Sequence, residues 1–120
     1  MNTPDDRPTE VDITRIVHTF YERVRADEIL APVFEARIGD EWDPHLARMV
    51  AFWNGVLRGK PGFIGDPVGK HRAMADVEPH HFDRWLELFA SVLADCVPPY
   101  IAADIHGRAC RMRVALEGPA

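Results

Sequence analysis

The sequence has few of the features that mark several large classes of protein. Only two of its 120 residues are cysteines, Cys96 and Cys110, and they lack the C-x-x-C spacing of a zinc or redox motif. We expect both thiols to be free and buried, as in a reducing compartment. Residues 1–8 are polar and acidic, so no secretory signal is predicted, and no segment is long enough to cross a bilayer. A location in the cytoplasm is therefore expected.

Basic residues are also few, and they are scattered along the chain. Fourteen Lys and Arg residues against nineteen Asp and Glu residues give a formal net charge of −5. Without a positive stripe, the chain is not expected to bind nucleic acid. Its 47% hydrophobic content excludes a disordered chain, and its length suffices for one domain. We expect a flexible N-terminal tail over residues 1–8 and a single domain over residues 9–120.

Strand-type alternation and internal repeats are absent from the sequence, whereas apolar residues recur at helical spacing. Thr9 and Asp12 have the spacing of a capping box at the start of a first helix. Pro32 limits the following segment to one or two turns. A longer helix is expected to begin at Asp43-Pro44 or nearer Asp40.

In the second half of the chain, prolines again mark where helices begin and end. Asp66-Pro67 predicts a short helical turn, because aspartate caps free N–H groups and proline is tolerated in the first turn. Pro79 predicts the start of a strongly amphipathic helix, and Pro98-Pro99 separates it from a last helix over about residues 100–116. The predicted fold class is all-α, with four longer helices joined by short turns.

Four residues with polar tips lie on or beside the predicted apolar faces: Tyr21, His45, His71 and Trp85. For Tyr or Trp alone, a place in the core with the polar tip hydrogen-bonded is the more common role. His71 lies on the short turn beside the amphipathic helix. Because neutral imidazole is a good metal ligand, such a histidine suits the axial position on a flat cofactor. No Glu-x-x-His repeat supports a di-iron bundle.

Taken in order, these segments resemble a truncated haemoglobin, and most closely group III of that family. The resemblance runs from about residue 11 to residue 113. The lack of paired glycines between the helices favours group III over the other truncated groups. The motifs that carry the resemblance are Phe-Tyr-Glu-Arg-Val-Arg at 20–25, Leu-Ala-Pro-Val-Phe at 30–34, Ala-Phe-Trp-Asn-Gly-Val-Leu at 51–57, Lys-His at 70–71 and His-Phe-Asp-Arg-Trp-Leu-Glu-Leu-Phe at 81–89.

The resemblance implies a globin-like, two-over-two helical sandwich that encloses haem b, with His71 as the proximal iron ligand. It places Tyr21 and Trp85 on the distal side, where their O–H and N–H groups can donate to a bound ligand, and His45 near the entrance. Arg48 and Lys70 are candidates for the haem propionates. The residues implied to bind the cofactor are Phe34, Arg48, Met49, Phe52, Trp53, Lys70 and Phe82.

The resemblance also implies binding of O2, NO or other diatomic ligands. NO dioxygenation and peroxidase-type redox chemistry are both compatible with it. Turnover would need an external reductase, because the chain contains no flavin- or NAD-binding module. Two alternatives stay open from the residues alone: a cofactor-free helical protein-interaction domain, and a His-based zinc or non-haem metal site.

Overall fold

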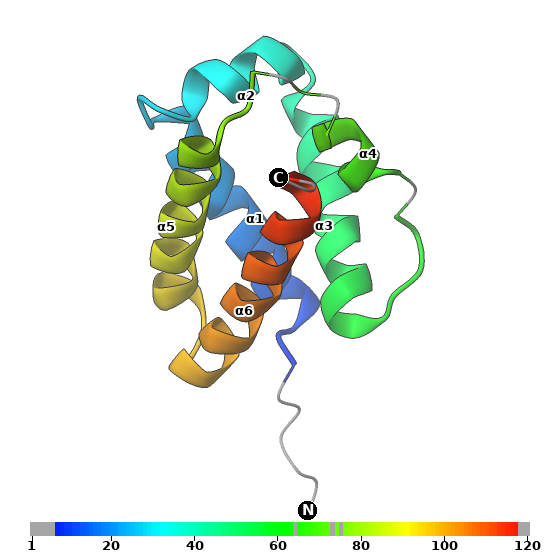
Figure 1. Ribbon diagram of the computed structural model, residues 1–120. Helices are drawn as coiled ribbons and strands as arrows, with labels where there is room; N and C mark the ends of the chain where they lie inside the picture. Colours follow the sequence, from blue (N-terminus) through cyan, green and yellow to red (C-terminus); the bar gives the residue numbers. More distant parts are fainter. Residues whose placement is uncertain (1–6, 64, 73, 75, 118–120) are drawn as a thin grey trace, which may run out of the picture.

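A computed structural model describes residues 7–63, 65–72, 74 and 76–117, and all regular secondary structure in these segments is helical (Figure 1). The all-α prediction is confirmed, with four longer helices and two short ones. The helices are α1 (Glu10–Arg25), α2 (Ala31–Ile38), α3 (Trp42–Arg58), α4 (Pro67–Arg72), α5 (Pro79–Cys96) and α6 (Pro99–Glu117). None of them, over the part described, is long and apolar enough to cross a membrane.

The predicted helix caps at Thr9 and Asp66 are both present. The N–H of Asp12 donates to Thr9 Oγ1 at 3.0 Å, and the N–H of Thr9 donates to Asp12 Oδ2 at 3.0 Å. Ahead of α4, the N–H of Gly69 donates to Asp66 Oδ1 at 3.0 Å. These side chains satisfy N–H groups that have no partner within a helix, and so they set where α1 and α4 begin.

α3 begins at Trp42, between the two starts expected from the sequence. Its cap residue is Glu41, which makes no side-chain capping bond, and Asp43 lies inside the first turn instead of before it. Pro44 is tolerated there because the first N–H groups of a helix need no intrahelical partner. The helix ends at Arg58 and is capped by Gly59, whose φ of +67° is the left-handed conformation common after helix ends.

Most of the expected N-terminal tail, residues 1–6, lies outside the described residues. Pro8 is buried, and its carbonyl oxygen accepts a hydrogen bond from Arg58 Nη1 at 2.8 Å. Both cysteines are free thiols; Cys96 is buried as predicted, whereas Cys110 on α6 is only half-buried.

The four longer helices pack as two layers. α1 and α3 lie against each other in one layer, α5 and α6 form the other, and α1 also packs against α5 (Figure 1). The short connection at Pro98 makes α5 and α6 antiparallel neighbours. α2 packs on α1, and α4 packs on α6. The expected two-over-two sandwich is therefore observed.

Aromatic rings join the layers in the core. The ring of Phe20 on α1 contacts the edge of Phe89 on α5, with centroids 5.3 Å apart. Trp53 on α3 stacks on the same Phe89 ring at 5.4 Å. Val24 and Val92 beside them are fully buried. This contact fixes the distance between the layers and forms one wall of the cavity described next.

Candidate functional site

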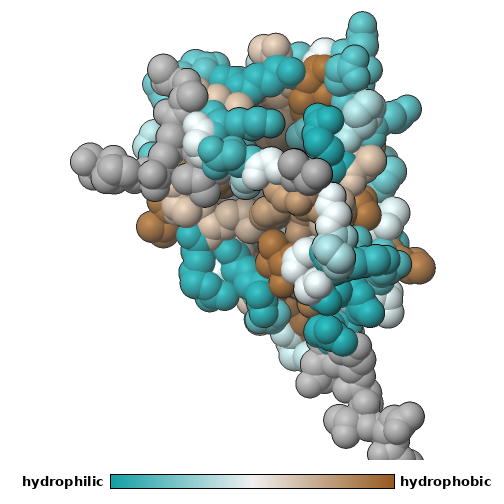
Figure 2. Space-filling model, turned by 90° about the vertical axis from the view of Figure 1, so that its right-hand side faces the viewer, coloured by the Kyte–Doolittle hydropathy of each residue, from teal (hydrophilic) through white to brown (hydrophobic). Residues whose placement is uncertain are grey.

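A cavity of about 460 Å³ lies between the layers, a size typical of small-molecule and cofactor sites. Figure 2 views the side on which α3 and α4 lie in Figure 1, and it shows apolar side chains gathered in the middle of that face among polar ones. Every site residue predicted from the sequence lines this cavity: Tyr21, Phe34, His45, Arg48, Met49, Phe52, Trp53, Lys70, His71, Phe82 and Trp85. The fold thus brings together residues from all of the helices α1 to α5.

His71 lies near the end of α4 and is half-buried. Its Nδ1 lies 2.7 Å from the backbone carbonyl oxygen of Pro67, one turn earlier. Because a carbonyl only accepts, Nδ1 carries the proton of the neutral ring and Nε2 keeps its lone pair. Metal-binding histidines are commonly held in this way, with the second ring nitrogen donating to a carbonyl. The geometry therefore fits the axial role predicted for His71.

His81, at the start of α5, also lines the cavity but has the opposite arrangement. Its Nδ1 accepts a hydrogen bond from the N–H of Glu78 at 2.9 Å, which closes the cap of α5. The neutral ring then carries its proton on Nε2, which is a donor and not a metal ligand. Among these two histidines, only His71 presents a lone pair on Nε2.

His45 on α3 has a buried Nε2 without a hydrogen-bond partner among the described residues. Its ring lies against Tyr21, with centroids 4.9 Å apart, and against Trp42 at 6.0 Å. Burial, and then the nearby charge of Arg48, lowers the pKa of His45 to about 4, so the ring is neutral at neutral pH. An unpaired polar atom on a cavity wall is the kind of group that a bound ligand can satisfy.

Tyr21 is held by rings on several sides. Its edge-on neighbours Phe20, Phe34, Trp42 and His45 have centroids between 4.9 and 5.9 Å away. Burial raises the pKa of the Tyr21 hydroxyl far above its ordinary value, so the group stays protonated. It is therefore a constant hydrogen-bond donor on a wall with little freedom to move.

Trp85 lies in the opposite layer, on α5, and is half-buried. Its ring stacks on Phe89 with an interplanar angle of 4° and a centroid distance of 5.9 Å, and it meets the edge of Phe20 at 6.3 Å. The indole N–H is a donor only. The cavity thus has aromatic donors from both layers, Tyr21 from α1 and Trp85 from α5.

Charged side chains lie at the edge of the cavity. Arg48 and Lys70 are both exposed lining residues, as expected for groups that would meet anionic substituents of a cofactor. Arg37 is a third lining cation that the sequence analysis missed. It donates to the carbonyl of Val33 at 3.0 Å and pairs with Asp76. Phe34, Arg37 and Ile38 are spaced so that they share one face of α2, and this spacing could have identified Arg37 as a residue facing the cavity.

Phe63 is a lining residue that no periodicity could have identified. It lies in the Gly/Pro-rich connection after α3, and the centroid of its ring lies 5.2 Å from that of Phe52.

A metal site built from several side chains is not found in the described structure. Across residues 7–63, 65–72, 74 and 76–117, no group of three or more His, Cys, Asp or Glu residues could hold an ion. The alternative of a His-based zinc site gains no support from the described structure.

Comparison with known proteins gives a family model described as "Bacterial-like globin", which matches residues 9–116. The group 3 truncated haemoglobin of Campylobacter jejuni subsp. jejuni is 37% identical over 84 residues, which cover 68% of this chain. That match spans 66% of the relative's length, slightly less than two thirds.

Solved structures share the fold. A group III truncated haemoglobin from Campylobacter jejuni matches with a TM-score of 0.85 and 30% identity, over 93% of this chain and 89% of that chain. A truncated haemoglobin from Tetrahymena pyriformis, at 19% identity, matches in fold with a TM-score of 0.71, over 87% of this chain and 86% of that one. The chain therefore belongs to the bacterial-like globin family and has the fold of a group III truncated haemoglobin.

Proposed function

We propose that the protein binds haem b in this cavity and thereby binds diatomic ligands such as O2 and NO. The observation that carries the proposal is the 2.7 Å contact between His71 Nδ1 and the Pro67 carbonyl, which leaves a lone pair on Nε2 of a residue that lines an apolar cavity. Haem supplies an iron site for small ligands when it is bound. His71 would hold the iron, and Arg48 and Lys70 would pair with the propionates. The apolar wall would come from Phe34, Met49, Phe52, Trp53 and Phe82.

On the distal side, Tyr21 and Trp85 would donate hydrogen bonds to the ligand, and His45 would stand near the entrance. The raised pKa of Tyr21 keeps its hydroxyl a donor, and the rings around it limit its movement. Each ~1.4 kcal/mol of such stabilisation slows ligand release about tenfold. Slow release suits redox chemistry better than transport, so NO dioxygenase or peroxidase-type activity is the finer proposal. Either activity would take electrons from a separate reductase.

We further propose a cytoplasmic location, which would suit the free thiols of Cys96 and Cys110 because a reducing compartment keeps thiols unpaired.

The absorption spectrum of the protein purified from haem-replete cells tests the proposal. We expect an intense Soret band at a stoichiometry of one haem per chain, with ferric and ferrous spectra that report the axial ligands. A colourless but fully helical and cooperatively folding protein would contradict haem binding. That result would favour a cofactor-free helical interaction domain instead.

A further inference from the structure

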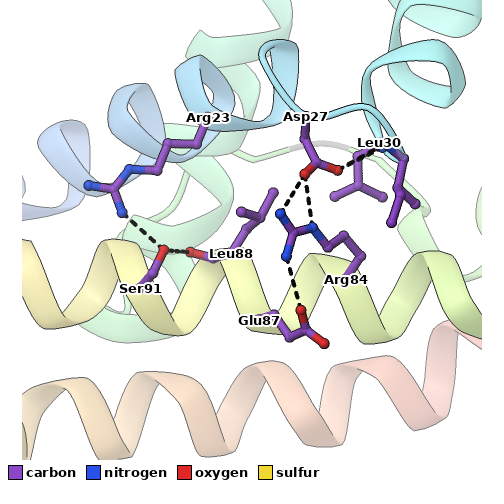
Figure 3. Close-up of polar contacts among 8 residues, drawn as sticks. Arg23, Asp27, Leu30, Arg84, Glu87, Leu88 and Ser91 are labelled. Carbon is purple, nitrogen blue, oxygen red and sulfur yellow. Dashed lines mark hydrogen bonds and ion pairs between the residues drawn. The ribbon is translucent and has the colours of Figure 1, made fainter.

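Asp27 and Arg84 form an ion pair between the α1–α2 connection and α5 (Figure 3). Arg84 Nε and Nη2 lie 2.8 and 2.7 Å from the same oxygen of Asp27. The other oxygen of Asp27 accepts the N–H groups of Leu30 at 3.0 Å and Ile29 at 3.2 Å. Arg84 Nη1 donates to Glu87 Oε2 at 3.0 Å. All three guanidinium nitrogens and both carboxylate oxygens therefore have partners.

Burial distinguishes this pair from the others. The Asp27 side chain is only 7% exposed, whereas the carboxylates of the other described pairs to Arg or Lys are at least 31% exposed. Exposed pairs contribute little to stability and tolerate movement. A buried carboxylate that loses its partner is left as an uncompensated charge, so its geometry is strongly held. The Asp27–Arg84 pair thus constrains where α5 lies relative to the end of α1.

Both ends of the pair adjoin residues that line the cavity. Leu30 donates its N–H to Asp27. The Leu30 side chain is 1% exposed and lines the cavity from the start of α2. Arg84 directly precedes Trp85, which lines the cavity from α5. Tyr21 lines it from α1, the helix that ends just before Asp27. One buried contact therefore joins three elements that carry the cavity wall.

We propose that Asp27 and Arg84 are positioning residues, which hold Trp85 and Tyr21 at a fixed separation across the cavity. This inference rests on the proposed function, in which those two side chains donate to the ligand. Hydrogen bonds weaken steeply as distance and angle depart from their optimum. A small displacement of α5 relative to α1 would therefore weaken the donor from Trp85 without emptying the cavity.

The chain supplies a matched control in Arg23. Arg23 joins α1 to α5 by donating to Ser91 Oγ at 2.9 Å (Figure 3). It also pairs with Asp95 on α5. Asp95 is 61% exposed, and Arg23, Ser91 and Asp95 are not among the residues that line the cavity. Both contacts hold α5, Arg23 from α1 and Asp27 from the connection that follows α1, and they differ in burial and in distance along the chain from Trp85.

The experiment compares Arg84→Gln, Arg23→Gln and the double variant Asp27→Asn/Arg84→Gln, each loaded with haem. The double variant leaves no unpaired buried charge, so it can fold even where the single one does not. We measure the oxygen dissociation rate, and we record fluorine NMR of fluorotryptophan-labelled protein with carbon monoxide bound. Trp85→Phe assigns the resonance.

We expect oxygen to leave about three- to tenfold faster from the Arg84→Gln and double variants, as for one weakened hydrogen bond. The Trp85 resonance should shift in both. Arg23→Gln should leave the rate and the resonance unchanged. Haem-loaded Arg84 variants with wild-type rates and resonances would overturn the positioning role, as would an equal effect of Arg23→Gln. A wild-type protein without haem would instead contradict the proposed function itself.

Discussion

His71 Nδ1 and the carbonyl oxygen of Pro67 lie 2.7 Å apart on successive turns of α4. This contact orients the imidazole and assigns its proton, so it decides which nitrogen is available to a metal. The short helix α4 thereby fixes the orientation of the one histidine that we propose as the iron ligand.

Replacing His71 by glycine is expected to abolish most of the Soret absorbance, because the proposed iron bond is lost. Added imidazole should restore part of it by occupying the vacated space. His81→Ala is the control, since it removes another cavity-lining histidine whose Nδ1 already accepts from Glu78. The absorbance spectra of both variants decide the assignment. If His71→Gly kept its haem and His81→Ala lost it, His81 and not His71 would be the iron ligand.

Tyr21→Phe and Trp85→Phe each remove a proposed donor, the first by deleting only the hydroxyl and the second by replacing the indole with a smaller aromatic ring. We expect each to speed oxygen dissociation, by about tenfold if the lost hydrogen bond contributes ~1.4 kcal/mol. Stopped-flow rates of oxygen release measure the effect. Unchanged rates in both variants would show that neither side chain reaches the ligand.

The pKa of His45, lowered to about 4 by burial and by Arg48, makes stability depend on pH. The unfolded chain takes up a proton below its ordinary pKa of about 6.5, whereas the folded protein resists protonation until about pH 4. The contribution of His45 to the free energy of unfolding should therefore be wholly present above about pH 6.5, and the free energy should fall by about 3 kcal/mol as the pH drops to about 4. Urea unfolding at a series of pH values measures this.

In His45→Gln that part of the pH dependence should disappear, because glutamine does not titrate. His18→Gln is the control, since His18 is exposed on α1. Arg48→Gln should raise the pKa of His45 by removing the nearby positive charge. A pH profile unaffected by His45→Gln would mean that other groups cause the dependence.

Two glycines should respond to alanine with opposite signs. Gly59 caps α3 with a φ of +67°, so Gly59→Ala is expected to lower the unfolding free energy by about 1 kcal/mol. Gly107 lies within α6, where an added Cβ would meet only Arg111 Nη1, at 3.5 Å. Gly107→Ala should therefore raise stability by about 0.5–1 kcal/mol through better helix propensity. Thermal or urea unfolding of both variants checks the pair.

Much of the fold could be predicted because it depends on local chemistry. Helix starts can be read directly from the sequence where the signal acts over only three or four residues. Examples are the capping box of Thr9 and Asp12, the cap at Asp66 and the proline at position 79. The start of α3 has no such local signal, because Glu41 makes no side-chain capping bond and proline is tolerated anywhere in the first turn of a helix. The family motifs then identified residues that do line one cavity.

Contacts between residues far apart in the chain could not be predicted in the same way. Arg84 and Asp27 are 57 positions apart, and neither residue differs locally from an ordinary surface charge. Phe63 reaches the cavity from an irregular connection, where no period applies.

The helical character of the chain, the starts of most of its helices and the family that its motifs resemble all follow from neighbouring residues and their spacing. Three further features appear only in the folded protein: His45 is neutral, Asp27 meets Arg84, and His71 lines a cavity between the layers. Those features depend on burial and on hydrogen-bond partners, which exist only once the layers have packed.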